Sequence, residues 1–519
     1  MKNKKIIIIL VVFTTFMMGA PAMAFSIPQK SYHSSADNDL DPLVDIQVTV
    51  TIKAIRSLEK VDQKMHSITK INWLGDPNFF VKVFINGVEF KSPIWKKTKY
   101  VYNPDWSVTF NVPDDQEWVG VRIELWDKSI VGNKQCDLSG ITEFNQQQIK
   151  EDRGVNLSYN IKTGHWIGDD NLNNMAFLKD PSGYGRVNGC DDGSIYQQDR
   201  DCELWFDINQ TDPDGDGIPY WTEVNIFHTD PTVNNANDDP NNDGIPLWWD
   251  FKWGFILNFQ DSPDGYIIEY NWTYNPFTSS NYSTLDPDND GLTNYEEYLT
   301  SQWGSDPYRK DIFVELDQMA PSPDGFKSQL PQGAKELIYT AFDRRNIVFH
   351  LDDGNMGGSE TIPFQKNVNR SSLQDIYYNY FLHGNTSNWR RGVFHYGVVV
   401  YQADFPGYTY RSDAYQISAY PLETNKTIPK TQSKRDIVFG SAYMHECGHT
   451  LGFDPIGGHD DNSKYPWQLG WWKWRPYKSI MNYGYMYQMV DYSDGSRGKN
   501  DFNDWERMDL TYFNGQDWG

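Results

Sequence analysis

Alternating apolar and polar positions indicate β structure in the first part of the chain. The stretch 44–55 alternates over most of its length, and the segments 79–85, 108–112 and 119–126 are of the same kind. A period of two places every second side chain on one face of a strand. Asn-Gly and Pro-Asp-Asp clusters between these segments favour turns. Several short strands separated by turns predict a β-sandwich over residues 43–209.

Strand and helix patterns alternate in the last part of the chain, residues 309–519. Strands are predicted at 311–317, 346–351, 393–401 and 414–420, and helices at 334–344, 373–382 and 441–451. The almost continuously apolar run at 393–401 is typical of a central strand. The shorter and more polar segment 414–420 is a candidate edge strand. The alternation predicts a mixed α/β or α+β domain.

Residues 1–24 have the pattern of a secretory signal peptide. Three lysines precede an apolar run over 6–19, and Ala-Met-Ala at 22–24 provides the small residues of a cleavage site. We therefore expect cleavage after Ala24 and a secreted or cell-surface location. The following segment, 25–42, is rich in Ser, Asp and Asn and is expected to be a linker.

The charge of the chain limits its partners. Among 519 residues, 46 are Lys or Arg and 70 are Asp or Glu, which gives a net charge of −24. Nucleic-acid binding needs basic surfaces opposite phosphates, so we expect no nucleic-acid partner. Anionic membranes would also repel this chain unless metal ions bridge the two. Beyond the N-terminal run, no apolar segment is long enough for a polytopic membrane protein.

Two segments of the predicted sandwich resemble a known family. DPNFFVKVFING (76–87) and NPDWSVTFNVPDDQEWVGVRIELWDKS (103–129) are similar to the calcium- and lipid-binding sandwich domains first described in protein kinase C. The resemblance implies calcium ligands at Asp76, Asp127 and Asp137, and a route to membrane contact. The second acid usual after Asp127 is missing, since Lys128 and Ser129 follow. The alternative is a structural sandwich that acts as a prodomain, spacer or docking module.

Residues 210–308 contain three in-frame copies of an acidic twelve-residue loop. They read DPDGDGIPYWTE (212–223), DPNNDGIPLWWD (239–250) and DPDNDGLTNYEE (286–297). An EF-hand-type loop takes oxygen ligands at positions 1, 3 and 5, a glycine at 6, a backbone carbonyl at 7 and a carboxylate at 12. The predicted calcium ligands are Asp212, Asp214, Asp216, Ile218, Glu223, Asp239, Asn241, Asp243, Ile245, Asp250, Asp286, Asp288, Asp290, Leu292 and Glu297.

The middle loop is expected to bind more weakly, because Asp250 reaches less far than a glutamate at position 12. The alternative for the whole region is an acidic solvated linker. The three loops resemble the calcium repeats of thrombospondin type 3 and dockerin-like modules. That resemblance implies a connector stiffened by structural calcium between the sandwich and the C-terminal domain.

The segment HECGHTLG (445–452) has the spacing of a zinc site. His445 and His449 are four residues apart on one helix face, so two imidazoles can bind one zinc ion. Glu446 is adjacent and can act as general base on a zinc-activated water. Gly452 allows the chain to turn after the helix.

HECGHTLG and SIMNY (479–483) together resemble the HExxHxxG motif and the Met-turn of metzincin metallopeptidases. The resemblance covers roughly 309–519, is closest to the pappalysin-like branch, and implies an α+β catalytic domain. It gives Met481 the role of an apolar floor under the metal and Tyr483 that of stabilising the oxyanion. It also implies that an edge strand, here 414–420, binds substrate by β-augmentation.

The sequence differs from this family at the position of the third zinc ligand. The position three residues after the glycine is Pro455, which cannot bind metal. Asp454, His459, Asp460 and Asp461 are the candidates, with His459, Asp460 and Asp454 preferred in that order, and a domain with no third ligand would be inactive. The sequence thus predicts a secreted zinc endopeptidase acting on protein or peptide substrates. The alternative is a calcium-dependent cell-surface adhesin or structural protein with a vestigial peptidase domain.

Overall fold

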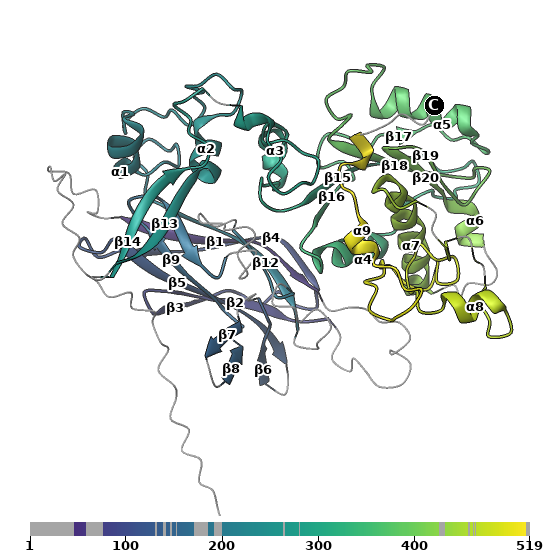
Figure 1. Cartoon of the computed structure of the whole chain (residues 1–519), viewed down its shortest axis with the longest axis horizontal. Helices are drawn as coiled ribbons and strands as arrows, with labels where there is room; N and C mark the ends of the chain where they lie inside the picture. Colours follow the sequence, from purple (N-terminus) through teal and green to yellow (C-terminus); the bar gives the residue numbers. More distant parts are fainter. Residues whose placement is uncertain are drawn as a thin grey trace, which may run out of the picture.

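The computed structural model describes residues 46–58, 76–129, 132–138, 142–145, 148–151, 153–170, 185–190, 200–262, 265–279, 281–424, 431–454, 457–459, 461 and 463–514. The predicted signal peptide, the linker at 25–42 and the candidate ligand Asp460 lie outside these residues. Figure 1 shows the sandwich strands on the left, the connecting region with α2 and α3 above them, and the C-terminal domain on the right.

Two antiparallel sheets form the predicted N-terminal sandwich. One has the order β11 (Arg186–Asn188), β12 (Cys202–Gln210), β1 (Gln47–Ser57) and β4 (Tyr100–Asn111). The other has the order β10 (His165–Gly168), β9 (Val155–Asn160), β5 (Trp118–Ser129), β2 (Phe79–Ile85) and β3 (Val88–Lys91), with β6 (Gly132–Gln135) beside β5. Alternate side chains such as Val48 and Val83 join one shared core. A separate hairpin joins β7 (Thr142–Asn145) and β8 (Gln148–Glu151).

The region 210–308 is more structured than a row of calcium loops. It contains α1 (Tyr220–Thr222), the π-helix η1 (Glu223–Phe227), α2 (Leu247–Gly254), the hairpin β13 (Phe255–Ser262) and β14 (Gly265–Trp272), η2 (Tyr282–Thr284), α3 (Asn294–Thr300) and η3 (Ser301–Trp303). It also packs on the sandwich, because the His165 ring nitrogen Nε2 lies 2.8 Å from the carbonyl oxygen of Phe251.

A six-stranded mixed sheet forms the centre of the C-terminal domain. Its order is β16 (Val348–Asp352), β15 (Asp311–Met319), β18 (Phe394–Val400), β20 (Ala414–Ser418) and β19 (Gly407–Arg411), and β17 (Thr361–Ile362) also pairs with β15. All pairings are parallel except that of β19 with β20. The expectation of an edge strand at 414–420 is therefore wrong: β20 is an inner strand, and β19 forms the edge.

The helices of this domain cover both faces of the sheet. They are α4 (Gln332–Asp343), α5 (Arg370–Ile376) with the π-helix η4 (Tyr377–Phe381), α6 (Ala419–Thr424), α7 (Gln432–Thr450), α8 (Leu469–Trp474), α9 (Asp504–Arg507) and η5 (Tyr512–Asn514). Ile312, Val314 and Leu316 of β15 pack in one core with α4 and α7, and Phe313 packs in the opposite core with α5 and η4. Among the described residues, no helix combines the length and apolar character needed to cross a membrane.

The sandwich contacts the C-terminal domain directly. Arg56 of β1 forms an ion pair with Asp343 at the end of α4, and both side chains are almost fully buried. Asn188 donates a 2.7 Å hydrogen bond to the Asp343 carbonyl oxygen, and Arg344 donates one of 2.5 Å to the carbonyl oxygen of Leu58. The two domains therefore share a polar interface in addition to the connecting region.

Candidate metal centres

Helix α7 places the HECGHTLG segment deep in the C-terminal domain. The helix begins at Gln432, nine residues before the predicted start, and the side chain of Thr431 caps it by accepting a hydrogen bond from the backbone N–H of Lys434. Its apolar residues, among them Val438 and Phe439, join the core that also contains β15. This packing fixes the direction in which the two histidines of the helix point.

Three imidazoles converge at the end of this helix. The ring centroids of His445, His449 and His459 lie 5.1–5.2 Å from one another. One ring nitrogen of each lies within 4.8 Å of the other two, and the Nε2 atoms of His449 and His459 are 3.3 Å apart. Three nitrogen ligands so close together match a zinc site that keeps a fourth position open.

Backbone carbonyls orient the two helical histidines. Nδ1 of His445 lies 2.8 Å from the carbonyl oxygen of Ile480, and Nδ1 of His449 lies 2.8 Å from that of Phe453. A carbonyl only accepts hydrogen bonds, so each Nδ1 carries the proton and each Nε2 keeps a lone pair for a metal. Burial lowers the pKa of His445, which also favours the neutral, metal-binding form.

Glu446 follows His445 on α7 and packs against the edge strand β19. Its Oε2 accepts a 3.0 Å hydrogen bond from the hydroxyl of Thr409, and Gly407 leaves no room for a side chain beside it. Burial raises the pKa of Glu446 to about 8, whereas the hydrogen bond from Thr409 opposes that rise. A carboxylate with such a pKa can accept and return a proton near neutral pH.

The SIMNY turn lies against the same helix. Met481 is buried, and a methyl group placed on Gly448 would lie 2.9 Å from its sulfur, so helix and turn approach closely. The ring of Tyr483 is 5.5 Å from that of His445 and 5.0 Å from that of His459. The structure thus places both residues of the turn beside the imidazoles.

The structure separates three of the four candidates for the third ligand. His459 joins the two helical histidines, whereas Asp454 and Asp461 belong to no metal-capable cluster among the described residues, and Asp454 is exposed. Asp460 lies outside those residues. The sequence could not decide among them, because it does not show how the loop after Gly452 folds back.

The three acidic loops share one backbone geometry. In each, the carboxylate at position 1 accepts a hydrogen bond from the glycine N–H at position 6: Asp212 from Gly217, Asp239 from Gly244 and Asp286 from Gly291, over 2.6–3.0 Å. These glycines have φ between +84° and +97°, a conformation that L side chains rarely adopt. Three loops with the same turn match the EF-hand pattern.

The carboxylates at position 12 are buried in all three loops. Glu223, Asp250 and Glu297 are at most 1% exposed, and each has at least one buried oxygen without a hydrogen-bond partner among the described residues. Burial raises the pKa of Glu223 to about 7 and that of Asp250 to about 8. Acids of the first and third loops form groups that could hold a metal ion.

Sequence analysis missed one carboxylate of the third loop. Asp311, the first residue of β15, lies with Asp290 and Glu297 in a buried cluster whose oxygens are within 4.8 Å of one another. Its N–H donates a 2.7 Å hydrogen bond to Asp290, and its carboxylate contacts His350 of β16 at 2.5 Å. The sequence did offer a signal for this residue, because an acid stands at the start of an apolar strand directly after the repeats.

The three predicted calcium ligands of the sandwich do not form a metal-capable cluster within the described residues. Asp127 instead accepts a 2.9 Å hydrogen bond from the N–H of Asn78 and one of 3.1 Å from Arg200. Asp76 is exposed and Asp137 is buried. The guanidinium of Arg200 thus already provides a positive partner for Asp127.

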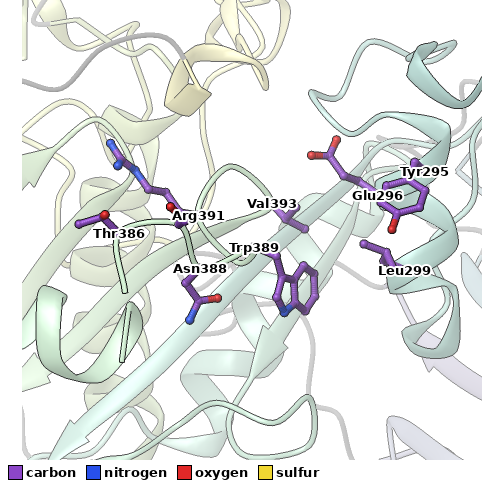
Figure 2. Close-up of a pocket in the computed structure, with 9 residues that line it drawn as sticks. Tyr295, Glu296, Leu299, Thr386, Asn388, Trp389, Arg391 and Val393 are labelled. Atoms are coloured by element: carbon purple, nitrogen blue, oxygen red, sulfur yellow. The ribbon is translucent and has the colours of Figure 1, made fainter. Parts of the chain in front are cut away.

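A pocket of about 330 Å³ lies away from the imidazoles. Figure 2 shows Tyr295, Glu296 and Leu299 of α3 on one side, and Trp389 and Arg391 of the loop before β18 on the other. The pocket therefore lies between the third acidic loop and the C-terminal domain.

Comparisons with solved structures find C2 domains that are similar to part of the chain. No protein-family model matches the sequence, and no curated protein is detectably similar to it. The solved structures similar to part of the chain include "Structure of a C2 domain" (TM-score 0.18, 8% identity, 32% of this chain and 98% of that one). A C2 domain protein from Ramazzottius varieornatus has a TM-score of 0.18 at 9% identity, over 32% of this chain and 87% of that one.

A solved C2 domain of plant Extended Synaptotagmin 1 has a TM-score of 0.14 at 20% identity, over 18% of this chain and 65% of that one. Because these TM-scores are low, the assignment of a sandwich rests on the two sheets of this chain itself.

Proposed function

We propose that this protein is a secreted zinc-dependent endopeptidase of the metzincin type, with its active site at the end of α7. The observation that carries the proposal is the convergence of His445, His449 and His459, with the buried Glu446 directly after His445 on the same helix. The donor set fits zinc: the described cluster consists of three imidazoles, and backbone carbonyls orient two of them.

Zinc bound there would polarise the scissile carbonyl and lower the pKa of a water molecule. Glu446 would take a proton from that water on its carboxylate and return it to the leaving amine. Thr409 holds the carboxylate toward the edge strand. Tyr483 would donate a hydrogen bond to the oxygen on which negative charge develops.

The edge strand β19 is the proposed binding site for substrate. It pairs with β20 on one side only and runs past Glu446. An extended peptide can add to such an edge through main-chain hydrogen bonds. The absence of a side chain at Gly407 leaves the space that the Glu446 carboxylate occupies beside this strand.

We further propose that the three acidic loops bind structural calcium. Calcium prefers a dense set of oxygen ligands, and the buried carboxylates at position 12 would complete each loop. Asp311 would add a ligand to the third loop, so that one calcium ion would join α3 to the first residue of β15. The loops would then stabilise the catalytic domain as well as the connection to the sandwich.

Hydrolysis of a mixed peptide library tests the proposed activity. The full-length protein, supplied with zinc and calcium, is compared with Glu446→Gln, which keeps the shape of the side chain but cannot act as a base. We expect cleavage that the variant lowers by about 100-fold or more. Equal cleavage by both would identify a contaminating protease. No cleavage by a folded, zinc-loaded protein would favour the calcium-dependent adhesin.

A further inference from the structure

A second group of carboxylates lies on the opposite face of β15 from the imidazoles. Ile312, Val314 and Leu316 face the core that contains α7. Successive side chains of a strand alternate between faces, so Glu315 and Asp317 point toward the core beneath α5 and η4. This group is therefore separate from the proposed active site and from the three loops.

Three carboxylates meet at this place. One oxygen each of Glu315, Asp317 and Glu360 lies within 4.8 Å of the other two. Glu315 and Asp317 are 0% exposed, whereas the side chain of Glu360 is 34% exposed. Glu360 thus provides a path to solvent for a group that is otherwise buried.

The positive charge around this group is small. Arg390 places Nε 2.5 Å from Oε2 of Glu315 and Nη2 2.6 Å from Oδ2 of Asp352. His383 lies 3.5 Å from Glu360 and is half-exposed. One guanidinium and one imidazole therefore face four carboxylates, and like charges in a buried site repel unless a cation or protons offset them.

The oxygen atoms of the group differ in how well they are satisfied. Asp352 accepts hydrogen bonds from the N–H groups of the glycine-rich loop that follows it, 2.8–3.1 Å long, so it acts as an anchor. By contrast, Oε1 of Glu315 and Oε2 of Glu360 are buried and accept no hydrogen bond within the described part of the chain. Asp317 lies between these extremes, with bonds from Tyr396 and the N–H of Glu360.

The glycine-rich loop also approaches the carboxylates closely. A methyl group on Gly358 would lie 2.6 Å from Cδ of Glu315 and 2.8 Å from Oδ2 of Asp352. A side chain at this position would displace the carboxylates of Glu315 and Asp352. The loop backbone therefore packs directly against the carboxylates of Glu315 and Asp352.

We propose that Glu315, Asp317 and Glu360 bind one calcium ion, which joins the loop between β16 and β17 to the central strand β15. The donors are all oxygen atoms, the type of ligand that calcium prefers. Their separation agrees with two Ca–O bonds of about 2.3–2.6 Å each, which together span roughly 4.6–5.2 Å. The site depends neither on zinc nor on the EF-hand-type loops.

Calcium content per chain tests this site. Full-length protein and Glu315→Gln are dialysed against the same calcium buffer and measured by mass spectrometry of the metal. We expect the variant to hold one calcium ion fewer than the wild type. Glu423→Gln, which removes an acid paired with Arg435 elsewhere on the surface, is the matched control and should hold as many as the wild type. Equal calcium in Glu315→Gln and wild type would overturn the proposal in favour of protons shared among the carboxylates.

A second measurement does not depend on the folding of a variant. Crystals of the wild-type protein loaded with terbium, a calcium substitute, should give an anomalous peak among Glu315, Asp317 and Glu360 in addition to peaks at the acidic loops. Peaks at the loops with none at this group would also overturn the proposal. Glu360→Gln, at the solvent side, should abolish the peak at this group alone.

Discussion

The hydroxyl of Thr409 on the edge strand lies 3.0 Å from Oε2 of Glu446 on α7. This contact joins the proposed substrate strand to the proposed general base. The hydroxyl also lies 3.0 Å from the carbonyl oxygen of Glu446, so strand and helix are linked at the backbone as well. The position of the base therefore depends on a strand that the sequence analysis did not predict.

Thr409→Val is expected to lower kcat about tenfold or more, because a hydrogen bond to a charged group is lost. The hydrogen bond lowers the pKa of Glu446, so its loss raises that pKa. The acidic limb of the pH profile of kcat/KM should then move to higher pH. Thr409→Ser keeps the hydroxyl and is the control. An unchanged pH profile in the valine variant would contradict this positioning role.

The identity of the third zinc ligand can be tested by metal content. His459→Ala should lower the affinity for zinc by about 10–100-fold or more, because it removes one of three nitrogen ligands. Asp454→Asn and Asp460→Asn should keep zinc at the wild-type level. Zinc loss in Asp460→Asn with zinc retained in His459→Ala would transfer the role to the aspartate.

The sequence predicted the local parts of the site and not its long-range parts. Helical geometry alone places His445 above His449, and the glycine at position 6 alone predicts the turn of each acidic loop. His459 and Asp311 reach their clusters through loops and strand order, which carry no periodic signal. The segment 414–420 was predicted to be an edge strand because it is polar. Its polar residues Gln416 and Ser418 are in fact buried in β20, where they bond to the carbonyl oxygen of Phe405.

The stability of the protein should depend strongly on the paired charges in the buried interface between the two domains. Arg56 and Arg186 face Asp343 and Glu203, so two positive and two negative groups meet. Asp343→Leu should destabilise the protein by about 3–5 kcal/mol, since it leaves a buried charge unbalanced.

The double variant Arg56→Leu/Asp343→Leu keeps the Arg186–Glu203 pair and should recover much of that loss in chemical denaturation. A double variant less stable than the single one would contradict charge balance as the cause.

Asp311→Asn should lower the calcium affinity of the third acidic loop about tenfold or more, because it removes one proposed ligand. Since Asp311 begins β15, calcium removal should expose the C-terminal domain to protease together with residues 210–308. Limited proteolysis with and without chelator, followed by mapping of the cuts, checks this expectation. Asp353→Asn, which removes a surface acid paired with Lys335, serves as the control. Cleavage confined to 210–308 would mean that the loop does not support the sheet.

The stabilising effect of calcium should grow with pH. Burial raises the pKa of Asp216 to about 6, of Glu223 to about 7 and of Asp250 to about 8. Between the usual carboxyl pKa and these values, the folded metal-free chain binds more protons than the unfolded chain, so its stability falls as pH rises. Calcium needs the ionised carboxylates, so its affinity rises over the same range.

The difference in Tm between calcium-loaded and metal-free protein should therefore be larger at pH 8 than at pH 5.5. Resin-treated protein is the reference, because the affinity of soluble chelators itself changes with pH. Glu223→Gln should reduce the dependence, since it removes one of the groups that titrate. A Tm difference that stays constant with pH would mean that these carboxylates are not the calcium ligands.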